Sequence, residues 1–318
     1  MSLTTQRALL SLLTKSDREE LDRIFGSRAR FDEPLAPYTS WKIGGPADAF
    51  VTVHSEGELA DLMRLSLRRK LAWWIVGGGS NVLVGDAGVR GLVIRLAGDF
   101  AAVEVGIEDG QVIVEAGGSA GMALVTAKAA SAGALGVGSL AGIPGTIGGS
   151  LRMNAGTDRE IGDFVRHVWV QSPSRPEPHA VSVRYLYRHS TLERDVVVSR
   201  LSLAFSRADT SEVREEMHGR LVRRKRTQPI ATPNAGSCFR NPDGDKAARL
   251  IESVGAKGWR EGGAEVSPLH ANFINNVGEA TARDVATLLA RVRRAVLDRH
   301  AVELRLEVHL VGVFIDAT

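Results

Sequence analysis

The sequence holds few of the groups that disulfide and metal chemistry require. Its 318 residues include one cysteine, Cys238, which excludes an internal disulfide and any zinc or iron–sulfur site built from several cysteines. The eight histidines are scattered, and no pair of them stands at metal-ligand spacing with a carboxylate. A reducing, cytoplasmic compartment is therefore expected.

Long apolar runs and strong charge of one sign are also lacking. No run of about 18 apolar residues occurs, so no membrane-spanning helix is predicted. The apolar patch at residues 9–13 is too short for a signal-peptide core. A formal charge of +3 suits a small anionic ligand and does not by itself indicate nucleic acid. The basic cluster at residues 223–226 lacks interleaved aromatics and is typical of a solvated helix end.

Glycine, in contrast, is abundant and concentrated. Between residues 71 and 156 lie 20 of the 34 glycines, which marks this region as a turn-rich domain. Residues 73–84 lead a short apolar strand into three consecutive glycines, and residues 138–156 hold six glycines with Pro144 fixing one turn. Neither segment has the spacing of a Rossmann turn or of a phosphate loop. Bare amides in such turns suit a pyrophosphate, and tight turns of a β-rich domain are the alternative.

The apolar pattern predicts an α+β protein in which a small α/β unit precedes the glycine-rich, strand-rich region and an α+β unit follows a boundary near Ser206. The expected elements are, in order, a helical lead-in within residues 1–30, strands at 38–48 and 49–53, a helix at 56–69, strands at 73–76, 81–84, 91–96, 102–106 and 111–115, a helix at 120–132, strands at 166–171, 180–183 and 196–205, helices at 209–226 and 246–253, strands at 264–266 and 272–276, a helix at 282–299 and a strand at 302–314.

Three short segments carry side chains that could take part in a reaction. Arg188 follows two tyrosines and could clamp a carboxylate, or it could be an exposed arginine on an edge strand. Ser237 is flanked by small residues and could transfer a proton, or bond its own backbone in a turn. Its neighbour Cys238 fits packing better than nucleophilic attack. Glu307 shares a predicted strand face with other charged residues, which solvation alone would explain.

The order of the motifs is more specific than any one of them. They occupy residues 42–48, 76–83, 141–149 with 154–156, 187–190, 235–242, 262–264 with 270–271, and 307–308. This series resembles the UDP-N-acetylenolpyruvoylglucosamine reductase family, in the shorter of its two forms, over about residues 38–312.

The resemblance implies an enzyme of bacterial peptidoglycan precursor synthesis, located in the cytoplasm. FAD is expected to bind non-covalently in a domain of the vanillyl-alcohol-oxidase (PCMH) type, followed by a C-terminal α+β substrate-binding domain. NADPH is the implied reductant of UDP-N-acetylglucosamine enolpyruvate, with UDP-N-acetylmuramate as product. The expected domains are residues 1–71 with 301–318 as the N-terminal α/β part of the FAD-binding region, 72–206 as the FAD-binding subdomain and 207–300 as the substrate-binding domain.

A monomer is expected, with a UDP-sugar substrate, no nucleic-acid partner and no membrane insertion. Two alternatives remain open at this point. One is another FAD-dependent oxidoreductase of the same fold, such as an alcohol or lactone oxidase. The other is a non-catalytic module that binds flavin or a nucleotide sugar.

The matching positions also imply roles for single residues. Arg188 and Glu307 would stabilise negative charge on the substrate carboxylate, and Ser237 would supply the proton. The residues implied to bind FAD are Val76, Gly77, Gly78, Gly79, Ser80, Asn81, Val82, Gly142, Ile143, Pro144, Gly145, Thr146, Gly148, Gly149 and Asn154. The residues implied to bind the substrate are Tyr187, Lys225, Asn241 and His270.

The chain departs from the usual family pattern near two of these residues. After residues 154–156 the family usually has one more residue and a further glycine before an acidic position, whereas this chain continues directly through residues 157–160. Leu306 stands where proline is usual, and His309 stands where lysine or arginine is common. The conformation of the loop at 157–160 is therefore not predicted by the resemblance.

Overall fold

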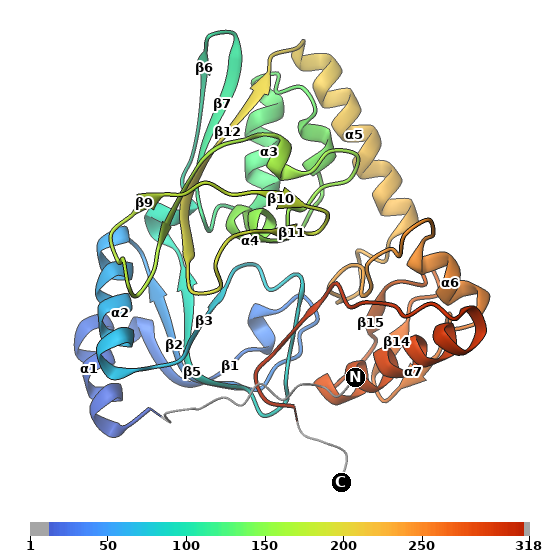
Figure 1. Ribbon diagram of the computed structural model, residues 1–318, viewed down its shortest axis with the longest axis horizontal. Helices are drawn as coiled ribbons and strands as arrows, with labels where there is room; N and C mark the ends of the chain where they lie inside the picture. Colours follow the sequence, from blue (N-terminus) through green and yellow to red (C-terminus); the bar gives the residue numbers. More distant parts are fainter. Residues whose placement is uncertain (1–12, 315–318) are drawn as a thin grey trace. The chain divides into compact units, whose positions relative to one another are not determined.

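The computed structural model describes residues 13–314 and divides into two compact units (Figure 1). Unit 1 holds residues 13–30, 49–78 and 91–224 of the described chain, and unit 2 holds residues 31–48, 79–90 and 225–314. Within the described range, no helix combines the length and the apolar character that crossing a membrane requires. The apolar residues expected in a helix at 9–12 lie outside the described residues.

A four-stranded sheet and two helices form the first part of the fold. The sheet has the order β1 (Ala29–Pro34), β2 (Pro46–Val53), β5 (Val89–Leu96) and β3 (Trp73–Val76), with β3 parallel to β5. Helix α1 (Lys15–Phe25) buries Leu21 and Phe25. Helix α2 (Glu56–Arg69) begins at the cap residue Ser55, whose hydroxyl accepts the N–H of Glu58.

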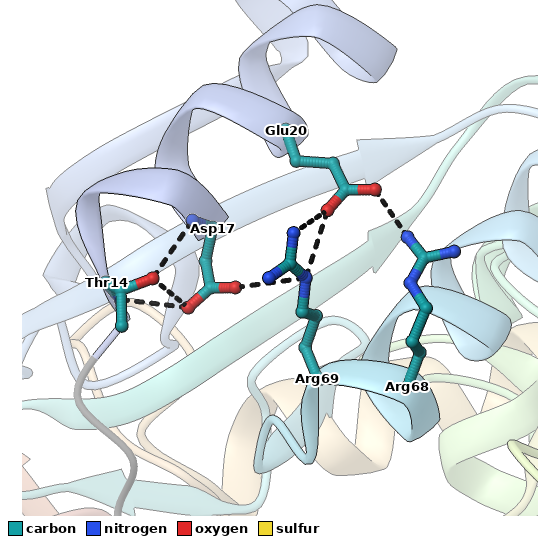
Figure 2. Close-up of polar contacts among 5 residues, drawn as sticks. All are labelled: Thr14, Asp17, Glu20, Arg68 and Arg69. Atoms are coloured by element: carbon teal, nitrogen blue, oxygen red, sulfur yellow. Dashed lines mark hydrogen bonds and ion pairs between the residues drawn. The ribbon is translucent and has the colours of Figure 1, made fainter.

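Helix α1 is fixed at its start by a capping box and along its side by ion pairs to the end of α2. The hydroxyl of Thr14 accepts the N–H of Asp17 at 3.2 Å, and the Asp17 carboxylate accepts the N–H of Thr14 at 2.9 Å. Figure 2 shows Glu20 between the guanidinium groups of Arg68 and Arg69. The arginines are exposed, so we attribute most of the docking energy to buried apolar contact and little to these pairs.

The glycine-rich region of unit 1 is built on a five-stranded antiparallel sheet. Helices α3 (Met122–Ser131) and α4 (Ile147–Arg152) pack against this sheet (Figure 1), and their apolar residues form one core with it. The strand order is β6 (Val103–Glu108), β7 (Gln111–Gly117), β12 (Val197–Ser206), β8 (Val165–Gln171) and β9 (His179–Ala180). Helix α5 (Thr210–Thr227) follows β12, and the hairpin of β10 (Tyr185–Leu186) and β11 (His189–Ser190) lies between β9 and β12 in sequence.

Unit 2 contains a second core around a three-stranded antiparallel sheet. Helix α7 (Ala282–His300) is capped by Thr281 and also by Asp86, whose carboxylate accepts the N–H groups of Ala282 at 2.8 Å and Arg283 at 3.0 Å. A short parallel pair of strands joins distant parts of the chain. The elements are α6 (Ala247–Ser253), β13 (Arg260–Glu261), β14 (Ala264–Val266), β15 (Ile274–Asn276), α7 (Ala282–His300), and the pair β4 (Val82–Val84) and β16 (His309–Val311).

Several expected elements differ in the structure, among them the strand at 180–183, of which only Ala180 lies in β9. Residues 38–45 form turns and irregular backbone rather than a strand, whereas residues 46–48 belong to β2. Trp41 is buried in this turn region, and its indole N–H donates to the Ile274 carbonyl at 2.7 Å. The closing strand is limited to His309–Val311, which pairs with β4, while Leu306 forms an isolated bridge with Phe239. Helix α4 lies in the second glycine-rich segment, where the sequence indicated turns.

Candidate functional site

The two glycine-rich segments meet in unit 1 with backbone against backbone. A Cβ atom added to Gly78 would lie 2.4 Å from the Cα of Gly145, and one added to Gly77 would lie 2.6 Å from the Thr146 hydroxyl oxygen. Only glycine fits at Gly78, because the facing atom belongs to the main chain. The structure therefore brings together the two segments that the sequence predicted to share one ligand.

Main-chain donors are available where these segments meet. The amides of Gly77, Gly78 and Gly145 donate no hydrogen bond to any residue in the described range, and Gly77 and Gly78 are exposed. Gly145 has a φ of +97°, a conformation that suits glycine. Unpaired amides in such a turn form a concavity that attracts an anion. This geometry fits the pyrophosphate of a dinucleotide.

Other glycines in the second segment serve packing within unit 1. Gly148 donates its N–H to the Gly118 carbonyl at 3.0 Å, and a Cβ there would lie 2.7 Å from that oxygen. The Gly142 carbonyl accepts a hydrogen bond from the Arg224 guanidinium. Burial lowers the pKa of Arg224, so this member of the basic cluster is not a solvated helix end as the sequence suggested.

Asn154 uses both ends of its side chain inside the protein. It is 2% exposed and has a φ of +46°. Its Oδ1 accepts the N–H of Gly162 at 3.0 Å, while its Nδ2 donates to the Leu186 carbonyl at 3.0 Å and to the Glu160 carboxylate. The observed contacts of Asn154 thus hold loops together, and its predicted contact with FAD stays a prediction.

Arg188 occupies the turn between β10 and β11. Its Nη1 donates to Oε1 of Glu160 at 3.0 Å, and its Nη2 donates to the Gly156 carbonyl at 3.0 Å. The guanidinium carbon lies 4.9 Å from the centre of the Tyr187 ring, and the Tyr187 side chain is exposed. The side chain of Arg188 is only 19% exposed, so the edge-strand alternative of a freely solvated arginine is wrong.

The loop that the resemblance left open supplies the partner of Arg188. Burial raises the pKa of Glu160 and the nearby charge of Arg188 opposes that rise. Arg159 turns elsewhere, with its guanidinium 4.2 Å from the Phe164 ring centre. Sequence reasoning did not select Glu160, although the family pattern marks an acidic position in this loop.

In unit 2, the structure brings Ser237 and Glu307 onto adjacent segments. The N–H of Glu307 donates to the Cys238 carbonyl at 2.8 Å, and Phe239 pairs with Leu306 in an antiparallel bridge. Ser237 is half-buried, and its hydroxyl has no hydrogen-bond partner within the described part of the chain. A hydroxyl that is not bonded to its own backbone is available to a ligand.

Asn81 ties the first glycine-rich segment to the segment that carries Glu307. Its Nδ2 donates to the Glu307 carbonyl at 3.1 Å, and its own carbonyl accepts the N–H of His309 at 3.0 Å. Strands β4 and β16 continue this contact with Val82 opposite His309. A residue predicted to bind FAD thus positions the backbone of a residue predicted to act on the substrate.

The predicted substrate-binding residues of unit 2 have different surroundings. Lys225 is exposed at the end of α5. The Oδ1 of Asn241 accepts the N–H of Ala247 at 3.0 Å. Burial lowers the pKa of His270, whose ring packs edge-on against Phe273 with a centroid distance of 4.6 Å. The substrate contacts of these residues stay predictions.

Comparison with known proteins identifies the family. Residues 47–170 match the family described as "FAD binding domain", and residues 228–311 match "UDP-N-acetylenolpyruvoylglucosamine reductase, C-terminal domain". A UDP-N-acetylenolpyruvoylglucosamine reductase of Anaeromyxobacter sp. (strain Fw109-5) is 41% identical over 299 residues, which is 93% of each chain. One of Myxococcus xanthus is 40% identical over 301 residues, covering 93% of this chain and 96% of the relative.

A solved structure agrees with these sequence matches. The crystal structure of the UDP-N-acetylenolpyruvylglucosamine reductase of Thermus caldophilus matches with a TM-score of 0.76 and 34% identity, covering 89% of this chain and 98% of that one. The expected α+β fold with an FAD-binding domain is confirmed. The chain belongs to the UDP-N-acetylenolpyruvoylglucosamine reductase family.

Proposed function

We propose that this chain reduces UDP-N-acetylglucosamine enolpyruvate to UDP-N-acetylmuramate with NADPH, through FAD, in bacterial peptidoglycan precursor synthesis. Family membership supports the reaction. The observation that carries the residue roles is the contact of the Glu307 segment with both Cys238, next to Ser237, and Asn81. FAD, when bound, would supply the hydride transfer from NADPH to the substrate.

The glycine-rich segments account for the binding of FAD without a covalent link. The amides of Gly77, Gly78 and Gly145, which donate to no residue between 13 and 314, would hold the pyrophosphate, because main-chain N–H groups bind anions without needing side chains. The Thr146 hydroxyl, which accepts the N–H of Gly149 at 3.4 Å, fixes the start of α4 beside them.

The role of Arg188 concerns the negative charge that develops on the substrate. Hydride addition to the terminal carbon of the enolpyruvyl double bond moves an electron pair toward the substrate carboxylate, which gives an enolate. A guanidinium at that carboxylate stabilises the developing charge. The exposed Tyr187 ring beneath Arg188 adds an apolar contact for the sugar. Glu307, when protonated, donates a hydrogen bond to the same negative centre.

Ser237 completes the reduction by proton transfer. The enolate carbon next to the carboxylate takes the proton of the hydroxyl, so that H⁻ and H⁺ together saturate the double bond while NADPH becomes NADP⁺. A serine hydroxyl has a high pKa, and it can serve here because the enolate is a strong base. The Ser237 hydroxyl is half-buried and has no hydrogen-bond partner among residues 13–314, which supports this role.

The test separates the two half-reactions. We expect Ser237→Ala to bind FAD and to be reduced by NADPH at the wild-type rate, yet to lose turnover by ~10²- to 10⁴-fold. Ser253→Ala removes a hydroxyl that donates to the Leu250 carbonyl in α6, and it serves as the control with full turnover. Near-full turnover of Ser237→Ala would refute the proton-donor role. Rapid reaction of the reduced protein with oxygen, without reduction of the enolpyruvyl substrate, would favour the oxidase alternative.

The proposed function includes an oligomeric state and a cellular compartment. We expect a monomer in the bacterial cytoplasm, without a nucleic-acid partner, and with domains near the boundaries predicted from the sequence. Light scattering of the purified protein measures the oligomeric state, and a dimer at micromolar concentration would contradict the expected monomer.

A further inference from the structure

One carboxylate joins two segments of unit 1 that carry predicted functional residues. Glu160 accepts a hydrogen bond from Nη1 of Arg188 at 3.0 Å and another from Nδ2 of Asn154. Its side chain is 23% exposed, and that of Arg188 is 19% exposed. Hydrogen bonds between charged partners with this degree of burial are stronger than those of solvated surface pairs.

The turn that carries Arg188 needs such support. Arg188 has a φ of +53°, a left-handed conformation that is strained for a non-glycine residue. The hairpin of β10 and β11 has only two residue pairs, Tyr185 with Ser190 and Leu186 with His189. The Leu186 carbonyl is held by Asn154, which is held in turn by Glu160. The network therefore constrains both the backbone and the side chain at Arg188.

Glu160 also determines the charge around Arg188. Among the described residues, the charges of Arg188 and Asp163 act on the Glu160 carboxylate. The Oδ2 of Asp163 in turn lies 3.8 Å from the Nε of Arg159. Arg188 and Glu160 together carry no net charge, so a substrate carboxylate meets a guanidinium that is already oriented by one anion. An amide at position 160 has one acceptor oxygen and one NH₂ donor, so it cannot accept from both Arg188 and Asn154 in the same way.

We propose that Glu160 is the positioning residue of Arg188, acting on substrate reduction through that guanidinium and through Asn154. This inference rests on the proposed function, because it assigns Arg188 to the enolpyruvyl carboxylate. Glu160 itself touches neither the reacting atoms nor the hydride.

The first experiment compares Glu160→Gln with Glu193→Gln, an exposed glutamate of the same unit. We expect Glu160→Gln to keep its FAD and its rate of reduction by NADPH within twofold, while kcat for the enolpyruvyl substrate falls ~10- to 100-fold, the size of loss seen when a residue that orients a directly contacting group is removed at metal sites. Glu193→Gln should change neither rate. An equal fall of both half-reactions in Glu160→Gln would show a merely structural role and overturn the proposal.

A double-mutant cycle tests whether Glu160 acts through Arg188. In an Arg188→Met background, Glu160→Gln should lower kcat by less than twofold, because its target is gone. A further loss as large as that in the wild-type background would contradict the proposal.

A measurement without turnover keeps this inference distinct from the proposed function. In the NMR spectrum of the substrate-free holoprotein, the Nη groups of Arg188 should rotate slowly in the wild type and fast in Glu160→Gln. Fast rotation in both proteins would refute the role of Glu160. Failure of the wild type to reduce the enolpyruvyl substrate would refute the proposed function alone.

Discussion

Replacing Gly78 with alanine tests the contact on which the predicted cofactor site depends. The added methyl carbon would lie 2.4 Å from the Cα of Gly145, whereas ordinary contacts begin at 3.4 Å. Two stretches of backbone must therefore separate by about 1 Å, since the methyl group cannot rotate away. Overpacking of this kind costs about 1–3 kcal/mol in folding free energy.

Two neighbouring variants calibrate the result. Gly77→Ala meets the Thr146 hydroxyl at 2.6 Å, a side-chain atom that can turn aside, so we expect a smaller loss. Gly121→Ala meets nothing within 4 Å and is the control. If half of the free-energy cost of Gly78→Ala falls on FAD binding, the dissociation constant rises about 2- to 12-fold, since 1.4 kcal/mol is a factor of ten.

Flavin fluorescence titration and thermal unfolding measure the two effects. For Gly78→Ala we expect weaker FAD binding and a Tm lower by about 2–12 °C, at 2–4 °C per kcal/mol. The order of loss should be Gly78→Ala, then Gly77→Ala, then Gly121→Ala. Equal FAD affinity and equal Tm for Gly78→Ala and Gly121→Ala would refute the backbone contact.

Two further predictions concern buried groups with raised pKa values. The Tyr185 hydroxyl is buried without a hydrogen-bond partner among the described residues, and burial raises its pKa to about 12. We expect Tyr185→Phe to raise the unfolding free energy by about 1 kcal/mol in urea titrations at pH 8, and a loss of stability would show a hidden partner. Since the folded state holds this proton more tightly than the unfolded state, wild-type stability should fall as the pH rises from 10 to about 12, and the variant should lose that dependence. Burial, with a smaller effect from the Glu307 charge, raises the pKa of the Cys238 thiol to about 12, so it should not react with a thiol reagent at pH 8 until the protein unfolds; fast labelling of the folded protein would contradict this.

Elements with a clear period were predicted well from the sequence. The helix expected at residues 56–69 is α2, with the same bounds, because its apolar residues lie on one face and Ser55 caps it. The strand expected at 302–314 was mostly wrong, because alternation does not reveal whether a partner strand exists. Helix α4 was missed since its two adjacent glycines disfavour helix, and the Thr146 cap and contacts with Gly118 outweigh that preference.

The candidate site, like the fold, could be predicted only in part from the sequence. The order of seven motifs, three of which contain Arg188, Ser237 and Glu307, was sufficient for the family resemblance, and the comparisons confirm that family. The pairing of Arg188 with Glu160 could not be predicted, because it joins residues 28 positions apart through the conformation of a loop that departs from the family pattern. The internal contacts of Asn154 depend on the same loop.

The double link through Asn81 has a mechanical consequence. Because its side chain and its carbonyl each hold the backbone beside Glu307, any ligand that draws the glycine turn into place also pulls the acid-bearing strand with it. With FAD bound at this turn, as proposed, cofactor binding and the alignment of Glu307 would be coupled. The cofactor would then help to order the chain for its substrate.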